Sequence, residues 1–264
     1  MTARLAVVGG GKMGGALVAG LLRAGWARPE ELAVVEPVAA RREELAADHE
    51  GLRVEADVPG AEGAVLAVKP ADVAAACAAV AGAGVARVLS IAAGVTLARL
   101  EGWLGPGVPV VRAMPNTPAL VGCGAAAIAA GSSAGPADLD WADGILSAVG
   151  VVVRVGEPAL DAVTGLSGSG PAYLFLVAEA LTEAGVLNGL SRDVSRALVV
   201  QTLLGSARLL AESGQEAADL RAAVTSPGGT TAAGVRALEA AAVRSALLEA
   251  VAAATERSRE LGRG

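Results

Sequence analysis

Short apolar runs alternate with longer alanine-rich stretches along the first 156 residues of this 264-residue chain. The apolar runs have the length of buried strands, and the alanine-rich stretches have the length of helices. Strand followed by helix, repeated, predicts a mostly parallel sheet covered on both faces, which is a doubly wound α/β domain. The expected strands are residues 5–8, 32–36, 64–68, 87–91, 108–112, 125–129 and 151–155.

Beyond residue 156 the strand pattern stops and helix signals follow one another. Pro171 suits the first turn of one helix, and Ser191 suits the N-cap of a second that reaches about residue 213. The last helix is expected to run to about residue 260, at a length of roughly 45 Å. A helix that long predicts packing against another subunit. We therefore expect two domains, residues 1–156 and an all-α dimerisation domain at 157–264.

Composition favours a small-molecule partner. The formal net charge of -6, without a cluster of basic residues, argues against a nucleic-acid surface. The apolar content of 53% is mostly Ala, Val and Gly, and charged residues interrupt the long runs, so no membrane span is expected. The apolar N-terminal run is too short for a signal peptide, which favours a cytoplasmic protein. Cys77 and Cys123 lack the spacing of a zinc site, so no metal is expected.

A glycine-rich loop follows the first expected strand directly and opens a helix. Its pattern, Gly9-x-Gly11-x-x-Gly14, lets the backbone approach a pyrophosphate, while the helix N-terminus supplies amide donors. This context predicts a Rossmann-like dinucleotide site, although chance matches are easy in a glycine-rich chain. The assigned cofactor residues of the loop are Gly9, Gly10, Gly11, Lys12, Met13 and Gly14. Core packing is the alternative for Met13.

Glu36 ends the second expected strand, where an acidic side chain usually binds the ribose hydroxyls of NADH. Arg41 and Arg42 follow closely and could instead accommodate the 2′-phosphate of NADPH, or could lie on a solvated helix face. The sequence therefore leaves NADH and NADPH both open.

Further cofactor residues are expected at the ends of three other strands. Lys12 and Lys69 are the only lysines, and Lys69 ends the segment Ala67, Val68, Lys69, Pro70 at the expected ligand edge of the sheet. Small residues, Ala92 and Ala93, end the next strand and would let a nicotinamide approach the backbone. Asn116 lies between two prolines, where it either contacts the nicotinamide or only holds a turn.

Six segments together closely resemble the pyrroline-5-carboxylate reductases: residues 8–14, 67–70, 90–94, 114–118, 165–173 and 226–231. The last, Ser-Pro-Gly-Gly-Thr-Thr before a long helix, is the most specific, and the resemblance covers essentially the whole chain. It implies NAD(P)H-dependent reduction of the cyclic imine (S)-1-pyrroline-5-carboxylate to L-proline, the last step of proline biosynthesis. It also implies a homodimer that forms through the helical domain, and such dimers often assemble further into decamers. The family's substrate residues match Ser226, Gly228, Gly229, Thr230 and Thr231.

The same loop suits a small carboxylate on physical grounds. Two glycines and three hydroxyls at a helix N-terminus offer backbone amides, side-chain donors and a favourable dipole. The alternative is an ordinary helix start with Thr230 or Thr231 as N-cap. We assign catalysis to Thr231, hydrogen-bonded to the imine nitrogen, and to Ser226, which holds the carboxylate with the backbone of residues 228–230.

The helical half lacks a conventional strong base. His49 is the only histidine, and no lysine follows Lys69. Oxidation of an alcohol needs a base for the hydroxyl proton, whereas an iminium already carries its proton and needs only orientation and electrostatic help. Two alternatives remain: a related imine or keto reductase for another small carboxylate, and a non-catalytic dinucleotide-sensing dimer.

Overall fold

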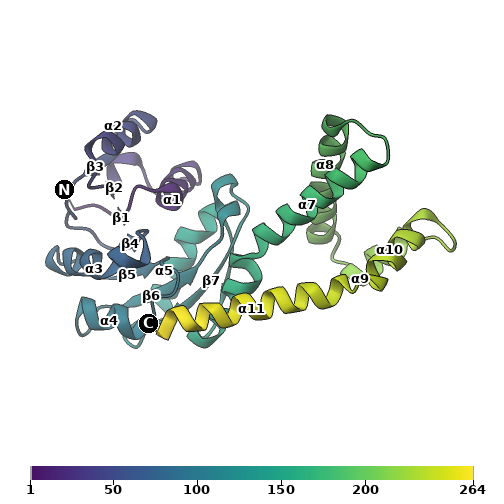
Figure 1. Ribbon diagram of the computed structural model, residues 1–264. Coiled ribbons are helices and arrows are strands. Elements are labelled where there is room, and N and C mark those ends of the chain that lie inside the picture. Colours follow the sequence, from purple (N-terminus) through teal and green to yellow (C-terminus); the bar gives the residue numbers. More distant parts are fainter. Residues whose placement is uncertain (1, 264) are drawn as a thin grey trace. The chain divides into compact units, whose positions relative to one another are not determined.

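The computed structural model describes residues 2–263, and these form two compact units. Unit 1 extends to Ser169 and also takes in the end of the last helix from Ala253, while unit 2 is Gly170–Ala252 (Figure 1). The end of the last helix belongs to unit 1 because Ser258 Oγ donates a hydrogen bond to Asp161 Oδ1 at 2.7 Å. The contacts thus divide the chain elsewhere than at residue 156, and the expected domain boundary stays a prediction.

Unit 1 is built on an eight-stranded sheet in the order β3-β2-β1-β4-β5-β6-β7-β8. All neighbouring strands are parallel except β6 and β7. The order of the first six strands is that of dinucleotide-binding doubly wound folds, so the predicted fold class is confirmed. The strands are β1 (Leu5–Val8), β2 (Leu32–Val35), β3 (Arg53–Glu55), β4 (Ala64–Leu66), β5 (Val88–Ser90), β6 (Val110–Met114), β7 (Gly124–Ala130) and β8 (Gly150–Arg154).

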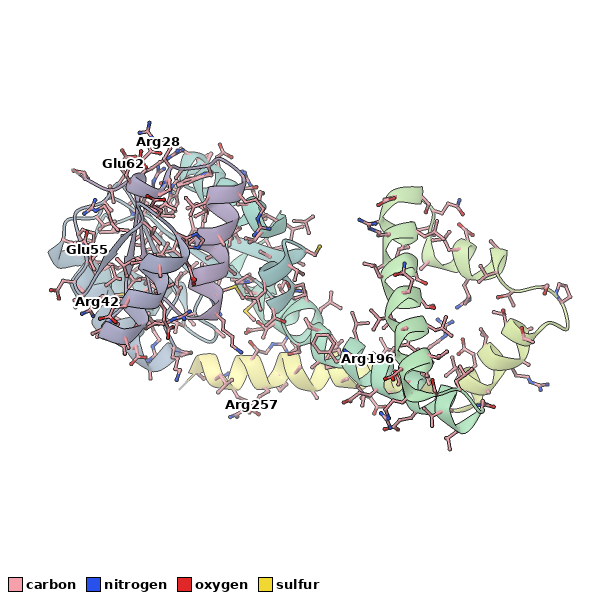
Figure 2. The ribbon with its side chains drawn as sticks, turned by 90° about the horizontal axis from the view of Figure 1, so that it is seen from above. Arg28, Arg42, Glu55, Glu62, Arg196 and Arg257 are labelled. Carbon is pink, nitrogen blue, oxygen red and sulfur yellow. The ribbon has the colours of Figure 1, made fainter. Side chains whose placement is uncertain are left out.

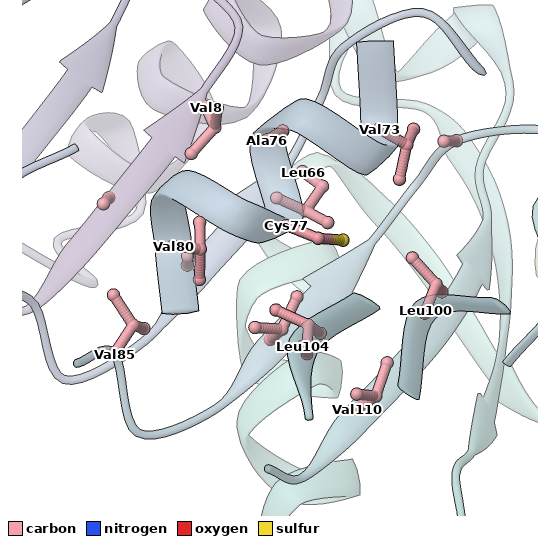
Figure 3. Close-up of a cluster of buried hydrophobic side chains, with 14 of the residues drawn as sticks. Val8, Leu66, Val73, Ala76, Cys77, Val80, Val85, Leu100, Leu104 and Val110 are labelled. Carbon is pink, nitrogen blue, oxygen red and sulfur yellow. The ribbon is translucent and has the colours of Figure 1, made fainter. Parts of the chain in front are cut away.

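Alternate side chains of each central strand enter two separate cores, one on each face of the sheet. In β1, Ala6 and Val8 pack with one buried cluster and Leu5 and Val7 with the other. Figure 3 shows the first cluster around Cys77. Because both faces are buried, the strands are continuous apolar runs rather than alternating ones. The helices of unit 1 are α1 (Lys12–Arg23), α2 (Ala39–Asp48), α3 (Val73–Gly82), α4 (Leu97–Leu104), α5 (Pro136–Leu146) and α6 (Leu160–Val163).

Unit 2 is helical. Its helices are α7 (Gly170–Leu187), α8 (Arg192–Ser213), α9 (Ala217–Ala223), α10 (Thr230–Ala240) and the first part of α11 (Val243–Arg263). Ser191 is the predicted N-cap of α8, and its hydroxyl accepts from the Val194 amide at 3.3 Å. The prediction of one uninterrupted last helix is wrong, because the chain breaks between α10 and α11 at Ala242, which has φ 55°. No glycine or proline marks this break in the sequence.

Two stretches are long and apolar enough to cross a membrane by length and composition, Glu157–Leu187 and Arg192–Ser213. Only 6% of the most apolar window of each is buried within the chain. Leu174, Phe175 and Leu176 of α7 are all exposed. Such evidence for a membrane is weak, because a surface that packs against another subunit presents the same apolar side chains.

Candidate active site

The loop between β1 and α1 is packed so closely that Gly9 and Gly14 cannot carry side chains. A Cβ atom on Gly14 would lie 2.0 Å from the carbonyl oxygen of Gly9. One on Gly9, which has φ 112°, would lie 2.6 Å from the carbonyl oxygen of Ala67. These contacts hold the end of β1 against both the start of α1 and the end of β4.

Gly11 differs from its neighbours, because a Cβ atom there would meet nothing within 4 Å. Gly11 is the N-cap of α1, no side chain caps the helix, and its first turn contains no acidic residue. No side chain therefore occupies the first amides of α1, and a helix N-terminus of this kind is suited to bind a pyrophosphate. The residues present fit a dinucleotide. Lys12 begins the helix and is exposed.

Glu36 reaches back into this loop from the end of β2. Its Oε2 accepts a hydrogen bond from the Gly10 amide at 3.2 Å, and its Oε1 accepts from the Val38 amide at 3.0 Å. Arg41 donates to the Gly10 carbonyl oxygen at 3.3 Å, and Arg42 to that of Glu36 at 2.9 Å. The acid and both arginines that bear on cofactor choice therefore gather at one corner of the sheet.

Parallel pairing brings the other predicted cofactor segments to the same edge. The Ala67 amide donates to the Val8 carbonyl at 2.8 Å, and the Ile91 amide to the Leu66 carbonyl at 3.1 Å. Lys69 is exposed and has no ion pair among residues 2–263. Ala92 is buried and Ala93 exposed. Val68 packs on the core, and Pro70 begins the short 3-10 helix Pro70–Asp72.

Asn116 holds a turn. Its Oδ1 accepts from the Ala125 amide at 2.8 Å, and its Nδ2 donates to the Ser167 carbonyl at 3.0 Å. These bonds join the loop after β6 to β7 and to a π-helical turn, Thr164–Gly168. Of the two roles considered for Asn116, the structure shows the turn, while contact with a nicotinamide stays a prediction.

The loop that precedes α10 belongs to unit 2, whereas the predicted cofactor residues belong to unit 1. Gly228 has φ 71°, and Gly229 is the N-cap of α10, so neither threonine has the capping role considered for it. A Cβ on Gly229 would lie 2.5 Å from Ser226 Oγ. Within residues 2–263 no hydrogen bond engages the hydroxyls of Ser226, Thr230 or Thr231. Three hydroxyls thus stand available beside the first amides of a helix.

Sequence reasoning missed one residue at this loop, Arg236. It lines a hollow of about 310 Å³ together with Gly228, Gly229, Ala232 and Ala233. Residues 229, 232, 233 and 236 share one helix face by their spacing, which is a signal the sequence does contain. The lining of this hollow includes the N-cap glycine of α10 and a positive charge, which together suit a carboxylate.

Comparison with known proteins decides the family. The Synechocystis sp. pyrroline-5-carboxylate reductase is 47% identical over 100% of both chains, and the Mycobacterium tuberculosis enzyme is 45% identical over 98% of this chain and 97% of its own. The chain belongs to the pyrroline-5-carboxylate reductase family. The family model for pyrroline-5-carboxylate reductase dimerisation matches residues 157–261, and that for NADP oxidoreductase, coenzyme F420-dependent, matches residues 4–94.

Solved structures of pyrroline-5-carboxylate reductases share the whole fold. The Coxiella burnetii enzyme superposes with a TM-score of 0.93 at 36% identity, covering 99% of each chain. The Plasmodium falciparum enzyme, solved with NADP bound, has a TM-score of 0.86 at 31% identity and covers 98% of each chain.

The loop before α10 offers hydroxyls and backbone amides, with Arg236 one helix face further on. Among residues 2–263 no three His, Cys, Asp or Glu side chains gather as a metal site would require. Unit 2 has neither lysine nor histidine in its sequence. Such a donor set can orient a substrate and stabilise charge, but it cannot deprotonate an alcohol.

Proposed function

We propose that this chain reduces (S)-1-pyrroline-5-carboxylate to L-proline with NADH or NADPH, the last step of proline biosynthesis. The observation that carries the proposal is the loop before α10, where Gly229 caps the helix and the hydroxyls of Ser226, Thr230 and Thr231 have no hydrogen bond within residues 2–263. A substrate with one carboxylate and one ring nitrogen uses these groups fully.

Each group of the loop has a defined task. Ser226 and the backbone amides of residues 228–230 hold the carboxylate, and Arg236 adds a positive charge at the edge of the hollow. The Thr231 hydroxyl oxygen accepts a hydrogen bond from the protonated imine nitrogen. The hydride adds to the imine carbon, the C=N π electrons move to nitrogen, and a neutral secondary amine results. The substrate brings its own proton, so this loop needs no base.

Residues at the edge of the sheet in unit 1 would hold the cofactor. The reduced nicotinamide supplies the hydride when it is bound. The amides at the start of α1 would bind its pyrophosphate, and Glu36 would bind the adenosine ribose. Residues 67–70 with Ala92 and Ala93 flank its path, and Asn116 positions the adjoining turn.

A second copy of the chain covers the apolar faces of α7 and α8 in this proposal. The dimerisation model matches residues 157–261, which include the exposed Leu174, Phe175 and Leu176. Changing Phe175 to Glu would then produce monomers in light scattering, whereas Glu212→Gln on α8 would leave the dimer intact. A detergent requirement for wild-type protein would instead support a membrane. Light scattering also tests assembly to a decamer, and cell fractionation tests the expected cytoplasmic location.

Steady-state assay with pyrroline-5-carboxylate and each cofactor tests the function, and no turnover with either would refute it. Thr231→Val should lower kcat/KM by about 10- to 100-fold, the loss of one hydrogen bond to a charged group. Thr225→Val is the matched control, because the Thr225 hydroxyl already donates to the Arg221 carbonyl at 2.6 Å. Turnover with another cyclic imine or a keto acid alone would favour a related reductase. Nucleotide binding without any turnover would favour a sensor.

A further inference from the structure

Glu36 is built into the phosphate loop rather than directed into solvent. Both carboxylate oxygens accept backbone hydrogen bonds, from Gly10 at 3.2 Å and from Val38 at 3.0 Å. A Cβ on Gly10 would lie 3.1 Å from Glu36 Oε2 and 2.5 Å from Leu45 Cδ1, so the position admits the carboxylate only because residue 10 is glycine. Each oxygen keeps a second lone pair for another donor.

The two neighbouring arginines are turned toward the protein. Arg41 donates to the Gly10 carbonyl at 3.3 Å and forms an ion pair with Glu44 at 2.6 Å. Arg42 donates to the carbonyl oxygens of Glu36 at 2.9 Å and Pro37 at 2.8 Å. Arg42 and Glu55, a residue of β3, are both labelled in Figure 2 and lie on the same side of unit 1. The guanidinium groups of Arg41 and Arg42 therefore stabilise the phosphate loop and the end of β2.

We propose that Glu36 makes this chain select NADH over NADPH. The inference rests on the proposed function only in taking a nicotinamide dinucleotide as the ligand. The remaining lone pairs of Glu36 accept the adenosine 2′- and 3′-hydroxyls of NADH. The 2′-phosphate of NADPH would instead lie next to a carboxylate that two amides hold in place. The negative charges of the phosphate and the carboxylate would repel each other.

A phosphate site built from Arg41 and Arg42 would need a different arrangement. Arg41 would have to leave Glu44 and Gly10, and Arg42 would have to leave two carbonyl oxygens. Glu36 would also have to swing away from the amides of Gly10 and Val38. NADH needs none of these changes, which is why the geometry favours it.

Equilibrium titration followed by nicotinamide fluorescence tests the inference without turnover. Wild-type protein should bind NADH at least tenfold more tightly than NADPH. Glu36→Gln keeps an acceptor for the Gly10 amide but removes the charge, so it should reduce this ratio at least fivefold, mainly by tighter NADPH binding. Glu43→Gln removes the same charge from an exposed position of α2 and should leave the ratio unchanged.

Two further variants keep the inference falsifiable if Glu36→Gln unfolds. Glu36→Asp should retain the preference for NADH, and Arg42→Gln should not weaken NADPH binding relative to NADH. Equal or tighter binding of NADPH by wild-type protein, or a selective loss of NADPH affinity in Arg42→Gln, would overturn it. NADH-selective binding without turnover of pyrroline-5-carboxylate would support this inference and contradict the proposed function. If neither cofactor binds, the inference and the proposed function are both contradicted.

Discussion

The side-chain amide of Asn116 bonds to the carbonyl oxygen of Ser167, 51 residues further along the chain, at 3.0 Å. At its other end the same amide accepts from the Ala125 backbone at 2.8 Å. Asn116 therefore pins the π-helical turn Thr164–Gly168 to the strand-end loop after β6. Single π turns are frequent at functional sites, and this one directly precedes the helical unit.

Asn116→Ala should lower the free energy of unfolding by about 1–3 kcal/mol, because it leaves a half-buried amide and a carbonyl without partners. Urea denaturation monitored by circular dichroism measures the loss. Asn188→Ala is the control, since Asn188 makes a single exposed bond to the Ala184 carbonyl at 2.8 Å. A smaller loss at Asn116 than at Asn188 would contradict the structural role.

Gly11→Ala should weaken cofactor binding while leaving the fold intact. The added methyl group meets no protein atom within 4 Å, but it occupies the space in front of the α1 amides, where the pyrophosphate must approach. We expect affinity for NADH to fall at least tenfold in fluorescence titration, with the melting temperature unchanged within about 2 °C.

Gly60→Ala serves as the control for this change, because a Cβ there also meets nothing within 4 Å, yet Gly60 is remote in sequence from the phosphate loop. It should keep normal affinity. Gly14→Ala, unlike Gly11→Ala, should destabilise the fold itself, since its methyl group would lie 2.0 Å from the Gly9 carbonyl oxygen. Normal NADH affinity in Gly11→Ala would place the pyrophosphate elsewhere.

Burial raises the pKa of the Cys77 thiol from 9.0 to about 11. Above pH 9 the thiol ionises in the unfolded chain while it stays protonated in the folded one. Its contribution to stability is therefore complete below pH 9 and is lost as the pH rises toward 11. Relative to Cys77→Ala, wild-type protein should lose roughly 2 kcal/mol of unfolding free energy between about pH 8 and pH 10.5.

Urea unfolding of both proteins at each pH measures this difference and cancels the other groups that titrate. A pH-independent difference for Cys77→Ala would mean that the thiol ionises equally readily in the folded chain.

The sequence predicts most of unit 1, because parallel strands buried on both faces are short, continuous apolar runs that are easy to recognise. It does not predict β3, whose residues Arg53, Val54 and Glu55 form a short, half-buried edge strand without such a run. The role of Asn116 also depends on a partner 51 residues away, which local pattern cannot reveal. Arg236 was missed because the spacing that places it on one face with residues 229, 232 and 233 was not followed beyond the loop.

The break between α10 and α11 could not be predicted either, because the residue at the break is an alanine. Ala242 has φ 55°, although alanine is the strongest helix former and a left-handed backbone costs an L-residue about 1–2 kcal/mol. Ala242→Gly should remove that strain and raise the free energy of unfolding by about 1 kcal/mol. Ala237→Gly, in the exposed middle of α10, should instead lower it by about 1 kcal/mol. Chemical denaturation of the two variants separates the cases: were both destabilised equally, residue 242 would lie in a continuous helix, and the single long helix would be right.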